Sequence, residues 1–330
     1  MQERNRIYLF DNVKAMLIFF VVLGHMLEII VSRRGELLYS FIYLFHMPLF
    51  VFCSGYFANF RPKRFFFSYA GLYVLFQLFY ILFARFALGV HWVPIQFSTP
   101  YWIMWYLMAL IAWTLILPLL DAVTIDKPAA IIAICASFAL GIAAGFDSMI
   151  GYYLSLSRIV YFFPFFVLGF CIRKHFDPDK MNAWLKNNIV RCFSGAVTIA
   201  IAVWIFTGNP INDPRWLWGS SSYEHLAYTG YNVVVRILLY AAALFISVFC
   251  IAVLPKRKLF FTTIGTRTLQ VFLFHGFIIQ LLRHNNIIYH LPWGIITWAF
   301  VFLVSIVTVL VFSSWLFAPS AWYKIFAKKR

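Results

Sequence analysis

The stretch DNVKAMLIFFVVLGHMLEII at residues 11–30 decides the fold of this chain. Apart from four ionisable residues it is almost wholly apolar, and about 20 such residues form a helix that crosses ~30 Å of hydrocarbon at 1.5 Å per residue. Apolar runs of similar length recur from one end of the chain to the other. The sequence therefore predicts an all-α fold, a polytopic bundle of membrane helices.

Composition supports the same conclusion. The chain has 330 residues, of which 63% are hydrophobic and only 12% charged, whereas soluble domains are nearer half apolar and a quarter charged. We expect one membrane domain over residues 1–330, with no separate soluble domain. Breaks at charges, prolines and polar clusters predict about ten spans, near 11–31, 37–58, 65–84, 101–120, 128–146, 151–172, 190–207, 230–254, 268–283 and 293–317.

The basic residues fix the predicted topology. With the N-terminus in the cytosol, inner segments hold 19 of the 27 Lys and Arg residues and outer segments hold five, which leaves Lys14, Arg158 and Arg236 near or within spans. This bias follows the positive-inside rule and places both termini in the cytosol. A net charge of +16 would suggest nucleic acid in a soluble protein, but here the cations lie in short loops between spans, so we expect no nucleic-acid partner.

Several classes of chemistry lack support in the sequence. The five cysteines have no metal-ligand or CxxC spacing, and no GxSxG, P-loop or HExxH motif is present. We therefore expect no metal site, hydrolase triad or nucleotide motor. The first apolar run is too long and too polar for a cleavable signal peptide, and we expect it to stay as a helix. The aromatic outer loop at 208–230 suits either stacking on sugar rings or an interfacial aromatic belt.

The first span carries the best candidates for chemistry. Lys14, His25 and Glu28 are costly in hydrocarbon, and such residues usually face a polar cavity. His25 and Glu28 are three residues apart and therefore share a helix face, while Asp11 is placed to pair with Lys14 one turn on. The alternative is a buried histidine that is hydrogen-bonded between helices.

Weaker candidates for the same cavity lie in other spans. His46 precedes Pro48, which should kink or loosen the second span, and helix lengths predict that His46 and His25 meet in the outer half of the membrane. His275 in the ninth span is either a cavity residue or part of a satisfied interhelical hydrogen bond. Arg158 either enters the cavity or extends outward to the interface.

Three cations follow the second span in the sequence Arg61-Pro62-Lys63-Arg64. In most membrane proteins such a cluster is a signal that keeps the segment in the cytosol. The functional alternative is a phosphate clamp, because Arg61 and Arg64 offer forked donors to an anionic ligand.

These motifs resemble the acyltransferase-3 family of bacterial integral-membrane O-acyltransferases, in particular its fucose 4-O-acetylase-like branch. The resemblance extends over about residues 7–283. Lys14 stands where the family usually has an arginine, eleven residues before His25, so the charge is kept but not the forked hydrogen bonding. The matching segments are the D-x-x-K opening, Gly24-His25, FHMPLFVFCSGY, Arg61-x-x-Arg64, WYL at 105–107, YFFPFFVLGF at 161–170 and IGTRTLQVFLFHG at 264–276.

The resemblance implies transfer of an acyl group, most often acetyl, from cytosolic acyl-coenzyme A to a hydroxyl of a cell-envelope glycan or lipid-linked sugar in the bacterial inner membrane. Acetyl-coenzyme A is then a co-substrate, with no permanently bound cofactor. His25 is the expected general base with Glu28 orienting it, and Lys14, Arg61 and Arg64 are the expected coenzyme A contacts. An acyl-enzyme intermediate remains an alternative.

Two other classes compete with this interpretation. A transporter or flippase for a glycan or acyl donor would use the same intramembrane His, Lys and Glu side chains. A noncatalytic scaffold would leave the cost of those buried ionisable residues unexplained.

Overall fold

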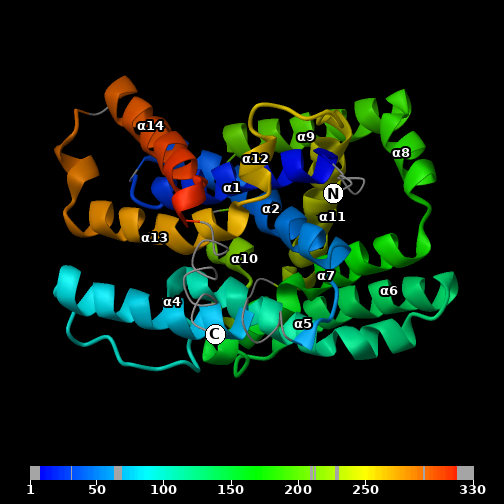
Figure 1. Cartoon of the computed structure of the whole chain (residues 1–330). Helices are drawn as coiled ribbons and strands as arrows, with labels where there is room; N and C mark the ends of the chain where they lie inside the picture. The colour runs from blue at the N-terminus through cyan, green and yellow to red at the C-terminus, as the bar shows by residue number, and fades with distance from the viewer. Residues whose placement is uncertain are drawn as a thin grey trace. The chain divides into compact units, whose positions relative to one another are not determined.

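The computed structural model describes residues 8–30, 32–62, 69–208, 211, 213–226, 230–292 and 294–317. Within these ranges every regular element is helical (Figure 1). The chain divides into two compact units, of which unit 1 comprises residues 1–42 with 249–330 and unit 2 comprises 43–248. The prediction of a single membrane domain over the whole chain stays a prediction.

Each of the ten predicted spans falls on a helix of the described chain, which confirms the all-α, polytopic fold class. Two of these helices are shorter, namely α4 (Gly71–Leu82), extended by a π-helical turn at Phe83–Ala87, and the 17-residue α13 (Thr268–His284). The other 8 are long and apolar enough to cross a membrane. They are α1 (Tyr8–Leu27), α2 (Arg33–Tyr56), α5 (Trp105–Val123), α6 (Lys127–Ala143), α7 (Leu156–His175), α9 (Asn188–Gly208), α11 (Asn232–Val253) and α14 (Ile295–Phe312).

Unit 1 is built around α1. This helix packs against α12 (Thr262–Gly265), α13 and α14, and α13 also packs against α14. Side chains at the start of α13 hold the end of α14, because Gln270 Nε2 donates to the carbonyls of Phe312 (2.6 Å) and Ser314 (2.7 Å). Arg267 Nη1 donates to the carbonyl of Ser313 (2.8 Å). These bonds satisfy the last carbonyls of α14.

Unit 2 is organised around α7, which packs against α5 and α6. Its closest approach is to α2, where two glycines allow the main chains to touch. A Cβ atom on Gly169 would overlap the carbonyl of Phe52, and one on Gly55 would overlap the carbonyl of Phe166. Small residues at such crossings let membrane helices gain dispersion energy through close packing. Both α2 and α7 continue through an internal proline.

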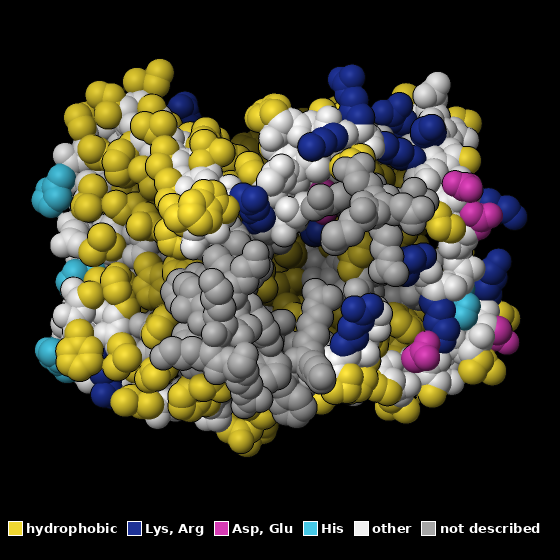
Figure 2. Space-filling view, viewed as in Figure 1, with side chains coloured by type: hydrophobic (Ala, Val, Ile, Leu, Met, Phe, Trp, Pro, Cys, Tyr) yellow, Lys and Arg dark blue, Asp and Glu magenta, His cyan; other side chains and the backbone are white. Residues whose placement is uncertain are grey.

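The surface of the long helices fits contact with lipid. On α14 the exposed side chains are large and apolar, and Figure 2 shows them as a continuous hydrophobic face. In water such an area would be a strong liability, whereas hydrocarbon solvates it. The exposed members on this helix are Ile295, Ile296, Phe302, Leu303, Ile306, Val307, Leu310 and Val311.

Some local structure was not expected from the sequence. The connection near 173–190, predicted to be cytosolic, contains the short helix α8 (Pro178–Lys186), which Asp177 caps by accepting from the amide of Asp179 (2.8 Å). Helix α2 begins four residues earlier than predicted because Ser32 Oγ accepts from the amide of Gly35 (3.1 Å). Shorter elements complete the described chain: α10 (Arg215–Trp218) and one-turn helices at Trp102–Met104, Ala144–Phe146, Tyr153–Ser155, Glu224–Leu226, Ile287–His290 and Trp315–Phe317.

The glycine crossing in unit 2 gives a direct test of packing. Gly169→Ala should lower the stability of the protein in detergent by about 1–3 kcal/mol, because the added methyl meets a main-chain carbonyl that cannot rotate away. The matched control is Gly151→Ala, where no atom lies within 4 Å of the added methyl. Thermal unfolding followed by fluorescence measures both, and equal midpoints for the two variants would contradict the proposed crossing.

Candidate active site in unit 1

The N-terminal part of α1 carries the ion pair that the sequence predicts. Lys14 Nζ lies 2.9 Å from Asp11 Oδ1, one turn away along the helix. Asp11 is only 7% exposed as a residue. A buried carboxylate is stable only when it is paired, so Lys14 neutralises Asp11 and is not available as an isolated cation.

Asn12, which the sequence analysis missed, is fully buried at the same end of α1. Its amide nitrogen donates to the carbonyls of Pro255 (2.8 Å) and Arg257 (3.0 Å), and its carbonyl oxygen accepts from Thr262 Oγ1 (2.6 Å). The side chain thereby fixes the basic segment that precedes α12 against the start of α1. Its signal in the sequence was a polar amide at the beginning of an apolar helix.

The outer end of α1 carries a chain of charged groups. His25 Nδ1 lies 2.7 Å from Glu28 Oε1, as the shared helix face predicts. The other carboxylate oxygen, Oε2, accepts from Arg283 Nη2 at 2.6 Å. Arg283 is in the last turn of α13, and the sequence analysis assigned it only to topology. Its available signal was that Glu28 and Arg283 both end spans on the predicted outer side.

Glu28 sets the tautomer of His25. An ionised carboxylate only accepts hydrogen bonds, so Nδ1 of His25 is the protonated nitrogen that donates to Glu28. In the neutral ring Nε2 then carries the lone pair. The side chains of His25 and Glu28 remain 15% and 19% accessible, so the pair is sheltered but not sealed. This is the arrangement of a base oriented by a carboxylate.

His275 lies against this group. Its ring stacks on that of His25 with centroids 5.5 Å apart, a contact that sequence reasoning did not anticipate. Its Nδ1 donates to the carbonyls of Phe272 (2.8 Å) and Val271 (3.1 Å) in its own helix, so the expected interhelical bond is instead intrahelical. The residue is fully buried, and among the described residues its Nε2 has no hydrogen-bond partner.

Lys14 and His25 lie on nearly the same face of α1. Eleven residues turn an α-helix by about three full turns and raise it by ~16 Å. The helix therefore presents a cation near its N-terminal end and an imidazole near its C-terminal end along one line. Both side chains keep partial exposure.

The remaining candidates belong to unit 2. His46 is buried in α2 with its ring edge-on to Tyr43, at a centroid distance of 4.7 Å. Its predicted meeting with His25 stays a prediction. Arg61 is exposed just beyond the end of α2, and Arg64 lies outside the described residues.

Arg158 is held by aromatic rings at the start of α7. Its guanidinium carbon lies 5.3 Å from the ring centre of Trp105 and 5.5 Å from that of Tyr152. Its Nε also donates to the carbonyl of Trp218 (3.3 Å). These contacts describe a packed cation with structural partners.

The described residues of the aromatic loop at 208–230 also pack within unit 2. The Tyr223 ring packs 4.4 Å from the guanidinium of Arg236, which is itself only 3% exposed. Burial raises the pKa of the Tyr223 phenol above its usual value, and the neighbouring arginine opposes that shift. At the loop surface, hydrogen bonds from Arg215 hold the pKa of Asp213 below its usual range. These aromatic side chains are engaged with the protein more than they are presented to a ligand.

Comparison with known proteins adds two findings. The model of the acyltransferase-3 family, described as an acyltransferase domain, matches residues 7–317. Nodulation protein NolL of Sinorhizobium fredii is 45% identical over 60 residues, a stretch that covers 17% of this chain and 16% of that protein. No solved structure matches the chain.

The tautomer of His25 is open to measurement. In wild-type protein labelled with ¹⁵N-histidine, we expect His25 to be protonated at Nδ1, because Glu28 accepts from that atom. Glu28→Gln should weaken this preference, since an amide both donates and accepts. Solid-state NMR of the ring nitrogens, assigned with a His25→Ala sample, distinguishes the two. Protonation at Nε2 in the neutral wild-type ring would refute the assigned hydrogen bond.

Proposed function

The chain belongs to the acyltransferase-3 family, and from that premise we propose that this membrane O-acyltransferase moves an acetyl group from cytosolic acetyl-coenzyme A to a hydroxyl of a cell-envelope glycan or lipid-linked sugar. His25 is proposed as the general base of the transfer. The expected location is the bacterial inner membrane, with the N- and C-termini in the cytosol.

One observation carries the proposal, namely the continuous contact from His25 through Glu28 to Arg283. A general base works best when its reactive nitrogen is fixed and its cationic form is stabilised. Glu28 supports both needs, since it accepts from Nδ1 and places a negative charge beside the imidazolium that forms. Arg283 in turn fixes the carboxylate through its second oxygen. Arg283 is thus a positioning residue in this scheme.

The reaction balances without any redox partner. His25 Nε2 removes the proton of the acceptor hydroxyl as the oxygen attacks the thioester carbonyl, and a new C–O bond forms. The tetrahedral intermediate then collapses, the C–S bond breaks, and the leaving thiolate recovers the proton from the imidazolium. The products are an acetyl ester and free coenzyme A.

His275 suits a supporting role in this scheme. Its buried ring stacks on one face of His25 and limits the rotation of that side chain. Because its own Nδ1 donates to main-chain carbonyls of α13, the ring orientation is set by the helix. A rigid neighbour lowers the cost of holding the base in a productive rotamer.

The donor is proposed to enter from the cytosolic side. Coenzyme A is strongly anionic at its nucleotide end, and the predicted inner segments are rich in cations. Arg61 and Arg64 are the proposed phosphate contacts, and Lys14 is proposed as a further donor to coenzyme A while its ammonium stays paired with Asp11. The ~16 Å that separate Lys14 from His25 along α1 then have to be spanned by the thin, uncharged arm of the donor.

Loss of the base should abolish most of the activity. His25→Ala should insert normally but transfer acetyl groups about 10²–10⁴-fold more slowly, the usual effect of removing a general base. The matched control is His284→Ala, a histidine whose side chain is exposed next to Arg283. Release of free thiol from acetyl-coenzyme A, in nanodiscs supplied with lipid-linked glycan extract, measures the rate.

Two outcomes separate the proposal from its rivals. Near-normal transfer by His25→Ala would remove His25 from the mechanism. Wild-type protein that moves glycan across a vesicle membrane but adds no base-labile ester would instead establish a transporter or flippase.

The predicted phosphate clamp has its own test. Arg61→Ala should weaken acetyl-coenzyme A binding and reduce the dependence of that binding on salt, because one charge contact is lost. Arg34→Ala is the control, since Arg34 is also exposed but lies on the predicted outer side. Calorimetric titration at low and high salt measures both variants. Unchanged affinity for Arg61→Ala would return this arginine to a role in topology.

A further inference from the structure

The segment at 88–101, which joins α4 to α5, is tied along one face of α4. Side chains spaced four residues apart along the helix contact the segment at 88–101. Tyr73 Oη donates to the carbonyl of Phe97 (2.6 Å), and Arg85 Nε donates to the carbonyl of Val93 (2.7 Å). Between them Ile81 packs in a small apolar cluster with Val93. The segment therefore has a defined conformation although it is not helical.

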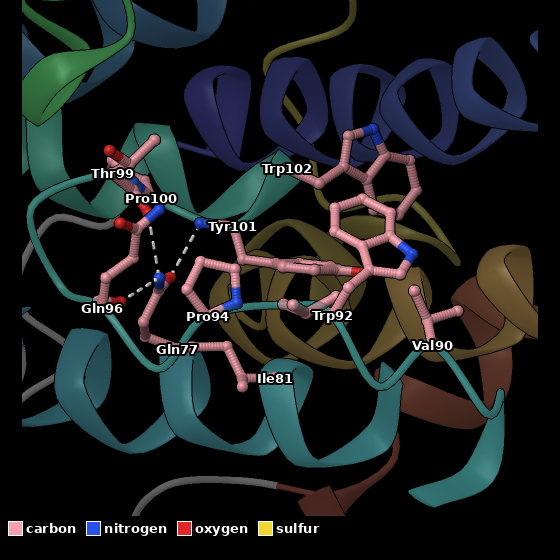
Figure 3. Close-up of a pocket in the computed structure, with 11 residues that line it drawn as sticks. Gln77, Ile81, Val90, Trp92, Pro94, Gln96, Thr99, Pro100, Tyr101 and Trp102 are labelled. Atoms are coloured by element: carbon pink, nitrogen blue, oxygen red, sulfur yellow. Dashed lines mark hydrogen bonds between the residues drawn. The ribbon is translucent and has the colours of Figure 1, made fainter. Parts of the chain in front are cut away.

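Gln77 is the central tie of this segment. The residue is 1% exposed and makes three hydrogen bonds, all drawn in Figure 3. Its Nε2 donates to the carbonyls of Gln96 (2.9 Å) and Thr99 (3.1 Å), and its Oε1 accepts from the amide of Tyr101 (2.8 Å). One buried amide thus fixes three points of the segment.

The fixed segment and α4 enclose a cavity of about 290 Å³. Figure 3 shows that its two ends differ in chemistry. The indoles of Trp92 and Trp102 lie at one end, and the polar groups of Gln77, Gln96 and Thr99 lie at the other. Both amide hydrogens of Gln77 are used within the segment, so the cavity offers flat apolar faces together with the side chains of Gln96 and Thr99 to the same small ligand.

The two tryptophans that line the cavity differ in exposure and backbone conformation from ordinary core residues. Trp92 is 82% exposed although its neighbour Val93 is buried. Trp102 has a φ of +40°, a conformation that bulky side chains rarely adopt and that costs roughly 1–3 kcal/mol. An exposed indole beside the cavity is accessible to a ligand, and backbone strain such as that of Trp102 is commonly found at functional sites.

No charged side chain is among the 11 residues that line the cavity. A ligand that carried a net charge would find no counter-ion there. A sugar ring fits this environment, because its C–H face stacks on aromatic rings while its hydroxyls pair with amide and hydroxyl groups. The volume lies near the lower end of the ~300–1,000 Å³ typical of small-molecule sites, which suits a single ring.

We propose that this cavity is a subsite for one neutral sugar ring, held by Trp92 and Trp102. This inference deepens the proposed function. The binding of a sugar ring does not depend on that function, but the identification of the ring as part of the acceptor glycan rests on it. The predicted topology places the segment on the outer side of the membrane, where envelope glycans are exposed. Trp92 and Trp102 then select for sugar shape, while the chemistry of transfer belongs to α1.

The binding experiment needs no acyl donor. Saturation-transfer NMR on wild-type protein in nanodiscs uses the methyl glycosides of glucose, galactose, mannose, fucose and N-acetylglucosamine as neutral probes, methyl glucuronide as the anionic probe and empty nanodiscs as the blank. We expect transfer from aromatic protein protons to at least one neutral glycoside. Trp92→Ala should weaken that binding roughly tenfold, the scale of one large aromatic contact.

The matched control is Trp184→Ala, which removes another half-exposed indole, 51% accessible, from α8. It should bind the glycoside like wild type. Because Trp92 is mostly exposed, its replacement leaves the buried ties of the segment intact. Binding that Trp92→Ala does not change, a stronger signal from the glucuronide, or no signal from any neutral glycoside would each overturn the subsite and make Trp92 a residue of the interfacial belt.

Kinetics separate this inference from the proposed function. If transfer occurs, Trp92→Ala should raise the KM for the acceptor while kcat and acetyl-coenzyme A binding stay near wild type. Normal acceptor KM in an active Trp92→Ala variant would overturn the subsite and leave the acyltransferase intact. Sugar binding that depends on Trp92, in wild-type protein without transfer, would support the subsite and count against the reaction.

Discussion

An ionisable side chain inside a membrane helix must be neutralised by a partner, and this requirement organises unit 1. Helix α1 and the residues that follow it contain two carboxylates, at Asp11 and Glu28. Asp11 is paired with Lys14, and Glu28 is shared between His25 and Arg283. Each pairing also fixes the position of the cationic partner, because that side chain must lie within hydrogen-bond distance of the carboxylate. The position of α13 relative to α1 is thereby linked to the state of the site.

The spans and local pairs were accessible to sequence reasoning because both depend on short-range spacing. Apolar run length placed each of the ten predicted spans on a helix of the described chain, and helical periodicity placed Asp11 with Lys14 and His25 with Glu28. The contacts that complete the site were not accessible in this way. Arg283 meets Glu28 from 255 residues away, and no local pattern encodes which of several outer cations will reach it.

Tertiary context also explains the other differences. His275 was assigned either to a cavity or to an interhelical bond, but its Nδ1 bonds to its own helix while its ring stacks on His25. The aromatic loop at 208–230 had a stronger composition signal for sugar binding than the segment at 88–101. One of its rings, that of Tyr223, instead packs on the guanidinium of Arg236. Only the buried hydrogen bonds of Gln77 reveal the second segment as a built cavity.

Two of the sequence blocks that suggested the family meet in unit 2. FHMPLFVFCSGY contains Gly55, YFFPFFVLGF contains Gly169, and each glycine faces the main chain of the other helix. The joint presence of these two glycines is therefore explained by a reciprocal packing requirement. Motif residues in this chain thus include some that build the helix bundle, such as these two glycines, and others that carry ionisable groups, such as His25.

The common face of Lys14 and His25 has a consequence for how this chain can vary. One inserted or deleted residue between them would rotate His25 by about 100° away from Lys14 and shift it by ~1.5 Å along the axis. A substitution in the same interval changes only one side chain. Between Lys14 and His25, helix α1 therefore tolerates substitutions wherever packing allows. It does not tolerate insertions or deletions, because these change the spacing and the shared face of the two residues.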